Sequence, residues 1–347
     1  MLKKIQISNV SFGFFKRFYL IYSNLFFFMK RIIAFDYVRS ICALWIIGLW
    51  HYHKYLSPEF HLSGDVFYFF AKITIIILGT FTFLSSFFLK KYEFFNAKDV
   101  IFFFKKRFYR FYILLFLSSI ALFFLGWYSP KQVIQIMTGT NCFGGTPAYT
   151  LWYFSMMIFF YLITPIIRWK NNRIRFFLVS FAIVFGVILI HNLQENIIDK
   201  RLAQNLPLYL LGLIIPTQRL VQILSKLFVF SLFTFLTIFL MWIDNSQSLI
   251  IEILYSIFVT FSLISFCLIT YRPCMFMVSI YLSTASMVAY LFHRQIYILT
   301  QMTLHKLFCI DYFPLLITPL LIAFIFIISH SIQTHWDKIC RKLFSTY

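Results

Sequence analysis

The chain has 347 residues, 61% of them hydrophobic and only 12% charged, whereas ordinary soluble domains carry roughly 25% charged residues. This composition excludes a soluble protein. The net charge of +20 could indicate nucleic-acid binding, but the basic residues are distributed over alternate loops and do not gather in one domain with interleaved aromatic residues. We therefore expect no nucleic-acid partner, and a lipid bilayer as the surrounding medium.

The hydrophobic residues form blocks of about 17 to 25 residues with little interior charge, the length that an α-helix needs to cross ~30 Å of hydrocarbon. Ten such blocks are predicted as membrane spans, at residues 32–52, 66–89, 111–128, 150–167, 176–190, 204–216, 227–243, 249–270, 279–299 and 313–330. The expected fold class is therefore all-α, a polytopic helical membrane protein with about ten transmembrane helices.

The distribution of positive charge predicts how this bundle is oriented. With the N-terminus inside, the cytoplasmic segments carry 23 Lys and Arg residues and the opposite loops carry five. The positive-inside rule then predicts that both termini are cytoplasmic, in a multi-pass protein of the inner (plasma) membrane. The remaining three basic residues, Arg39, Lys72 and Arg294, lie inside spans, where a charge costs ~2.5–3.5 kcal/mol on insertion scales.

The chain is expected to hold one membrane domain. Residues 1–30 form a basic and aromatic extension that could lie on the inner membrane surface, although translation could instead start at Met29. Residues 31–333 would form the transmembrane domain and residues 334–347 a short cytoplasmic tail. The six cysteines lack metal-like spacing, so no metal site is expected; Cys142 and Cys309, in outward loops, could pair or be incidental thiols.

The first span reads FDYVRSICALWIIGLWHYH over residues 35–53, with Arg39 near its inner end and His51 near its outer end. Arg39 could pair with Asp36 one turn earlier and extend to the interface, or it could face a polar interior. His51 lies twelve residues further on, ~18 Å along a helix and in the outer half of the membrane.

The ninth span, YLSTASMVAYLFHRQIYI over residues 281–298, brings a second histidine, His293, to a similar depth. Two histidines from separate helices could meet there, and a buried pair beside a polar cavity would suit proton transfer near neutral pH. The alternative for either histidine alone is an interfacial residue bonded to a loop carbonyl. Arg294, the next residue, could stabilise developing negative charge or bind substrate.

The third span opens with KKRFYR, residues 105–110. Arg107 and Arg110 are spaced i, i+3 and would share a helix face, where their guanidinium groups could hold phosphate or pyrophosphate. A basic flank that only sets topology is the alternative.

The fourth span opens with GGTPAYTLWYFSMM, residues 144–157, in which the glycines and proline predict a turn. Trp152 and Tyr153 follow at interfacial depth. They could anchor the helix at the membrane surface, or they could stack on a sugar ring.

Taken together and in this order, five blocks resemble the acyltransferase-3 family, the ten-span membrane proteins that O-acylate surface polysaccharides and related glycans. The resemblance runs from about Arg31 to the end of the tenth span. Its blocks are FDYVRSICALWIIGLWHY, KKRFYRFY, LWYFSMMIFFYLITPI, LPLYLLGLIIP and STASMVAYLFHRQIYI.

The first block departs from the family pattern by one residue. Eleven residues separate Arg39 from His51, one more than the family usually has. On a regular helix a twelve-residue step lands ~120° away from its start, whereas an eleven-residue step returns within ~20°. Either a π-bulge absorbs the extra residue, or His51 is not equivalent to the family histidine. We favour the bulge, because Trp50 cannot transfer protons and His53 would lie further out.

The resemblance implies roles for these residues. His51 would be the catalytic base, Arg39 its partner in the first-span motif, and Arg107 and Arg110 the R-x-x-R motif associated with acyl-CoA. No permanently bound cofactor is implied; acyl-CoA, acetyl-CoA above all, would be a donor substrate. His293 is placed with the catalytic residues, and Trp152, Tyr153 and Arg294 with the substrate-binding ones.

The function implied is transfer of an acyl group, acetyl being favoured, from cytosolic acyl-CoA to a hydroxyl of a cell-surface polysaccharide or lipid-linked oligosaccharide. Direct transfer and relay through an acyl-enzyme are both compatible with the sequence. The rival hypothesis is a secondary transporter or lipid-linked glycan flippase. Transporters often contain two repeated halves with broken helices, and no such repeat is visible in the sequence.

Overall fold

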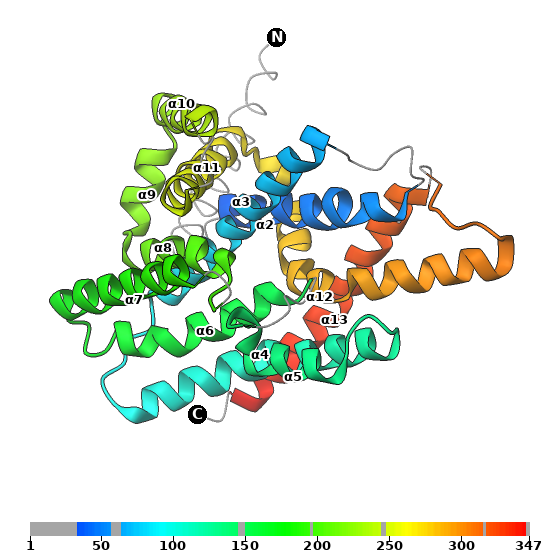
Figure 1. The fold of residues 1–347 in the computed structure, drawn as a ribbon, viewed down its shortest axis with the longest axis horizontal. Coiled ribbons are helices and arrows are strands. Elements are labelled where there is room, and N and C mark those ends of the chain that lie inside the picture. Colours follow the sequence, from blue (N-terminus) through cyan, green and yellow to red (C-terminus); the bar gives the residue numbers. More distant parts are fainter. Residues whose placement is uncertain are drawn as a thin grey trace, which may run out of the picture.

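The computed structural model describes residues 33–56, 64–144, 150–194, 197–243, 248–314 and 317–344. Within these ranges the backbone is helical apart from turns and two isolated β-bridges, so the expected all-α class is confirmed (Figure 1). The predicted extension at residues 1–30 and the alternative start at Met29 lie outside the described residues.

Every predicted span corresponds to a helix or to a pair of helices. The long helices are α2 (Ile33–Leu44), α3 (Gly64–Leu89), α4 (Ala97–Phe124), α6 (Trp152–Ile167), α7 (Arg173–Leu193), α8 (Lys200–Ile214), α10 (Leu227–Ile243), α11 (Leu249–Thr270), α12 (Phe276–Phe308) and α13 (Ile317–Phe344). Shorter ones are the π-helix η1 (Trp45–His51), the 3-10 helices η2 (Tyr52–Tyr55), η4 (Thr140–Cys142) and η5 (Pro273–Met275), and the α-helices α5 (Pro130–Thr138) and α9 (Thr217–Leu224).

By length and composition, seven helices among the described residues could cross a membrane. The pair α8 and α9, bent by 110°, would be an eighth if it forms one span. α6 and α10 are apolar but shorter. Ten spans and the sidedness of the termini therefore remain predictions.

The third predicted span begins earlier than expected. Asn96 and Asp99 form a capping box: the Asn96 side chain accepts from the Asp99 N–H (3.0 Å), and the Asp99 carboxylate accepts from the Asn96 N–H (3.2 Å). α4 therefore starts at Ala97, and the basic stretch 105–110 lies inside the helix instead of opening it. At the other end of the chain, α13 continues to Phe344, so most of the expected tail is the last turns of that helix.

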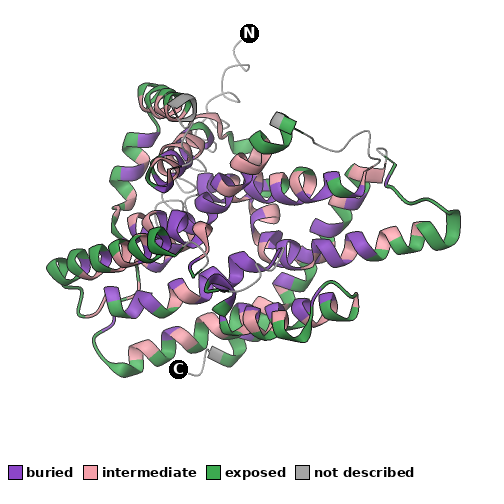
Figure 2. Cartoon of the chain, viewed as in Figure 1, coloured by how far each residue is buried: buried purple, intermediate pink, exposed green. Residues whose placement is uncertain are grey.

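The outer helices carry apolar side chains that point away from the protein. Figure 2 shows many buried residues along α2, α6, α8 and α12, with α7 largely exposed. Most of the exposed side chains on α7 are large and hydrophobic: Ile174, Phe177, Leu178, Phe181, Phe185, Leu189, Ile190 and Leu193. Such a surface is stable in contact with lipid and would associate in water.

Two helices that the sequence separates by more than two hundred residues form the centre. α2 and α12 run parallel, because Ser40 donates to the Ser279 carbonyl (2.9 Å) near their starts and Tyr297 donates to the Ile47 carbonyl (2.8 Å) further along. Residues at matched depths on these helices therefore face each other.

α3 and α8 approach closely at Gly212. A Cβ added there would lie 2.5 Å from the Phe83 carbonyl oxygen and 2.0 Å from Ser86 Oγ. Glycine is needed because the opposing atoms include backbone, which cannot rotate away.

Gly212→Ala is accordingly expected to destabilise the protein by roughly 1–3 kcal/mol, the usual cost of overpacking a close contact. The measurement is the melting temperature of the purified protein in detergent. Gly186→Ala on α7 is the matched control, because nothing lies within 4 Å of its added Cβ; it should leave the melting temperature unchanged or raise it. Equal effects of the two substitutions would contradict close α3–α8 packing.

Candidate active site

The first span changes from an α-helix to a π-helix over Trp45–His51. A π-helix turn holds one more residue than an α-helix turn, and single turns of this kind often occur at functional sites. This is the bulge that the Arg39 to His51 spacing predicts, so the prediction is confirmed. The Tyr297 hydroxyl bonds the Ile47 carbonyl within the π-helix, which links the bulge to α12.

The two predicted histidines are in direct contact. His51 Nδ1 lies 2.6 Å from His293 Nε2, and the ring planes are nearly parallel, at 6°. Both residues are buried. We call them the histidine pair.

The neighbours of His293 determine which nitrogens carry protons. His293 Nδ1 lies 2.8 Å from the Tyr290 carbonyl oxygen and 3.1 Å from that of Ala289. Carbonyl oxygens only accept, so Nδ1 carries the hydrogen, and in a neutral imidazole Nε2 must then accept. It follows that His51 donates from Nδ1 and keeps a lone pair on Nε2. The geometry thus gives His51 the protonation form of a general base.

His53 has a different environment. Its Nδ1 lies 2.5 Å from the Trp50 carbonyl, and its ring packs against Trp50 and Phe67. The alternative considered for His51, a histidine bonded to a nearby carbonyl, therefore describes His53 instead.

Arg294 lies beside the histidine pair. Its side chain is 5% exposed, and its Cζ lies 5.0 Å from the centre of the Trp127 ring. It lies within electrostatic range of both His51 and His293. Its Nε has no hydrogen-bond partner among the described residues. Its predicted role, stabilising developing negative charge or binding substrate, stays a prediction.

Arg39 is not brought to the histidine pair. Its Cζ lies 5.9 Å from the centre of the ring of Phe88, the second-last residue of α3. Asp36, the partner considered for Arg39, is buried and accepts a hydrogen bond from Ser283 of α12 (2.7 Å). Arg39 is half-buried in the middle of α2, with Tyr153 in electrostatic range. Arg39 could therefore contact a substrate only at the level of α2, away from the histidine pair.

Arg107 and Arg110 lie on α4 but contact different neighbours. Arg107 stacks over the Tyr92 ring (5.1 Å to its centre), and its Nη2 lies 3.4 Å from the Tyr92 hydroxyl. Arg110 forms an ion pair with Asp337 of α13 (3.0 Å). Sequence reasoning missed Asp337, and no local pattern in the chain links it to Arg110.

The same end of the bundle, which we call the basic end, holds two further cations. Lys90 donates to the Ile215 carbonyl (3.0 Å), and Arg168 donates to the Leu213 carbonyl (3.3 Å). Both therefore bond carbonyls at the C-terminal end of α8, just before its bend into α9, where cations are favourable. Burial, and then the nearby Arg168 charge, lower the pKa of Lys90 to about 8. These two residues have a structural role.

Trp152 and Tyr153 are buried, so they are not exposed membrane anchors as one interpretation expected. The Cζ of Arg201 lies 4.2 Å from the centre of the Trp152 ring and covers one of its faces. A sugar could stack on that face only if Arg201 moved. The Tyr153 ring lies 5.8 Å from the Tyr290 ring, which in turn is 6.4 Å from the His51 ring.

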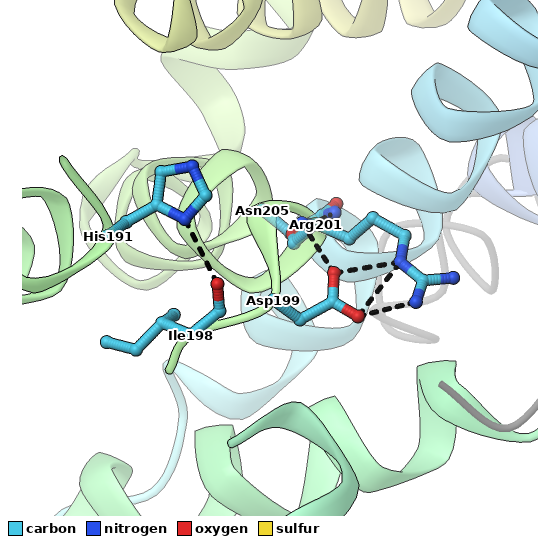
Figure 3. Close-up of polar contacts among 5 residues, drawn as sticks. All are labelled: His191, Ile198, Asp199, Arg201 and Asn205. Atoms are coloured by element: carbon cyan, nitrogen blue, oxygen red, sulfur yellow. Dashed lines mark hydrogen bonds and ion pairs between the residues drawn. The ribbon is translucent and has the colours of Figure 1, made fainter. Parts of the chain in front are cut away.

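Arg201 is held in place by the corner between α7 and α8. Its Nε lies 2.9 Å and 3.2 Å from the two carboxylate oxygens of Asp199, as Figure 3 shows. Asn205 donates to the Arg201 carbonyl (2.8 Å), and His191 donates to the Ile198 carbonyl (3.0 Å). Sequence reasoning counted Arg201 only as a loop charge, because its contact with Trp152 joins distant segments.

The long apolar helices with hydrophobic outer faces, around a buried histidine pair, define an integral membrane protein with a polar site in its interior. The family model described as an acyltransferase domain matches residues 32–332, which is most of the chain. The chain belongs to this family, acyltransferase-3. Comparison with curated proteins and with solved structures gave no match.

Proposed function

We propose that the protein transfers an acyl group, acetyl being favoured, from cytosolic acyl-CoA to a hydroxyl of a cell-surface polysaccharide or lipid-linked glycan at the inner (plasma) membrane. The observation that carries this proposal is the His51–His293 hydrogen bond, which leaves one imidazole nitrogen ready to accept a proton inside an acyltransferase domain.

In the proposed reaction, His51 Nε2 takes the proton from the acceptor hydroxyl as its oxygen attacks the thioester carbonyl. The new C–O bond forms, the C–S bond breaks, and the imidazolium returns the proton to the leaving thiolate. The products are an ester and CoA, so protons balance. General-base catalysis of this kind contributes about 10²- to 10⁴-fold in rate.

Arg294 is the candidate for stabilising the oxyanion that develops on the thioester carbonyl. Its guanidinium is buried near the histidine pair, and its Nε has no acceptor among the described residues. In a site that excludes water such a donor is worth more than at a surface, because the surrounding dielectric is low. Arg39 lies twelve residues before His51 on the first span and is better suited to contact the donor chain.

The donor nucleotide is proposed to bind at the basic end. Arg107 is half-buried, stacks on Tyr92 and has an Nε without a partner among the described residues. Arg110 is half-exposed and already paired with Asp337. A planar guanidinium holds phosphate through two parallel hydrogen bonds, so Arg107 is the stronger candidate of the two.

Arg107→Ala is therefore expected to weaken acetyl-CoA binding about tenfold, the loss of one charge-assisted contact, and Arg110→Ala to weaken it less. Calorimetric titration of the purified variants measures both. Lys105→Ala, which removes an exposed charge from the same helix, is the control and should bind as the unmodified protein does. If neither arginine variant loses affinity, the two arginines serve topology alone.

The proposed function is tested by deleting the gene and analysing the surface glycans of the strain by mass spectrometry. Loss of one ester-linked acyl group would identify the reaction, the acyl group and the acceptor together. Glycans that keep all their acyl groups but accumulate inside the cell would favour the transporter.

A further inference from the structure

Positive charge gathers close to the histidine pair. Arg294 and Lys54 lie within electrostatic range of each other, and both act on His51. Neither forms an ion pair with a carboxylate among the residues that the structure describes. Two cations so placed repel each other, and the buried one also loses its hydration.

Two other cations, Arg201 and Lys200, form ion pairs with carboxylates, whereas Arg294 and Lys54 do not among the described residues. Arg201 is held by Asp199, and Lys200 lies 2.8 Å from Glu252. For these two cations the chain therefore supplies a counter-ion. The Trp127 ring offsets part of the cost of burying Arg294, but an aromatic face carries no net charge.

Three buried polar atoms, on Arg294 itself and on segments near it, have no hydrogen-bond partner among the residues that the structure describes. They are Arg294 Nε, the Tyr55 hydroxyl and the Thr150 hydroxyl, all in residues that are at least nine-tenths buried. Tyr55 and Tyr128 are in electrostatic range of Arg294, and the Thr150 N–H lies 3.5 Å from the Tyr128 hydroxyl oxygen. A buried donor or acceptor without a hydrogen-bond partner destabilises the folded protein, so a cluster of three indicates a binding site for a polar ligand.

We propose that Arg294 and Lys54 bind a permanent negative charge on the acceptor, a carboxylate or a phosphate, close to the hydroxyl that is acylated. This inference rests on the acyl transfer proposed above. The transient oxyanion of that reaction needs only one cation at the carbonyl, which leaves Lys54, beside Arg294, for a charge that the acceptor itself carries. Lys54 is an exposed side chain just beyond the π-helix and is placed to meet the acceptor as it arrives. The orphaned hydroxyls would bond the anion or the neighbouring sugar hydroxyls.

Trp127 offers a built-in reporter, because it lies against Arg294. The experiment measures tryptophan fluorescence of the purified protein in nanodiscs during titration with three sugars, and subtracts the response of Trp127→Phe. The sugars are methyl glucuronide, which carries a carboxylate, glucose 1-phosphate, which carries a phosphate, and methyl glucoside, which is neutral. We expect one of the two anionic sugars to bind at least about tenfold more tightly than the neutral one. Which of them does so identifies the source of the charge.

Lys54→Gln should remove most of this preference, whereas Lys131→Gln, an exposed lysine on α5, should leave it unchanged. Equal binding of all three sugars, or an unchanged preference in Lys54→Gln, would overturn the proposal. If no sugar changes the fluorescence, the chemical structure of the native acceptor tests the proposal. An acylated repeat unit that carries neither carboxylate nor phosphate would overturn the proposal. A neutral acceptor whose acylation requires His51 would refute this inference and leave acyl transfer intact.

Discussion

His51→Ala is expected to lower acyl transfer by about 10²- to 10⁴-fold, the contribution of one general base. The physical reason is specific to one atom. The Nδ1–H of His293 donates to the carbonyls of Tyr290 and Ala289, so His293 Nε2 accepts a hydrogen bond from His51 Nδ1. The nitrogen of His51 that can take a proton is therefore Nε2. Alanine removes that lone pair. The measurement is transfer of radiolabelled acetyl from acetyl-CoA to isolated glycan by the purified variant.

His53→Ala is the control, because it removes a buried histidine of the same segment whose Nδ1 is occupied by the Trp50 carbonyl. It should retain most of the activity. His51→Gln, which keeps polarity at the site without a basic nitrogen, guards against misfolding and should be as inactive as alanine. An inactive His53→Ala together with an active His51→Ala would move the base two residues along the chain.

The fold was predictable where apolar length decided it. All ten hydrophobic blocks correspond to helices, because a continuous apolar segment in lipid must satisfy its backbone internally. Boundaries were less predictable. The third span starts at Ala97 because the Asn96–Asp99 capping box outweighs the basic residues that follow, and α8 and α9 bend by 110° at Pro216. A hydropathy profile averages over many residues, so it shows neither the capping box nor the bend.

The site was predictable in part, for a geometric reason. Depth along a helix follows from counting residues, so His51 and His293 could be placed at one level, and the spacing after Arg39 indicated the π-helix. Lateral contacts do not follow from counting. Arg201 over Trp152 and Asp337 beside Arg110 each join segments far apart in sequence. Only the packing of the helices reveals these pairs, and the chemical roles stay predictions.

His293→Phe is expected to lower acyl transfer about 5- to 150-fold, because it leaves the buried Nδ1–H of His51 without an acceptor at a cost of about 1–3 kcal/mol. Phenylalanine keeps a ring of similar size, so the packing against Tyr290 and Tyr297 should persist. His51 would then populate both neutral tautomers, and only one of them has the unprotonated Nε2 that the reaction needs. The rate of acetyl transfer measures the loss.

If His293 had only a structural role, the outcome would differ. Two observations distinguish that role from selection of the His51 tautomer. His293→Gln offers an amide oxygen that can accept from His51 Nδ1, so it should recover much of the activity that His293→Phe loses. In protein labelled with ¹⁵N-histidine, solid-state NMR should show His51 Nε2 as unprotonated in the unmodified protein and in His293→Gln, and as a mixture in His293→Phe. If both variants lose the same activity while the His51 signal stays unprotonated, the bond to His293 does not select the tautomer.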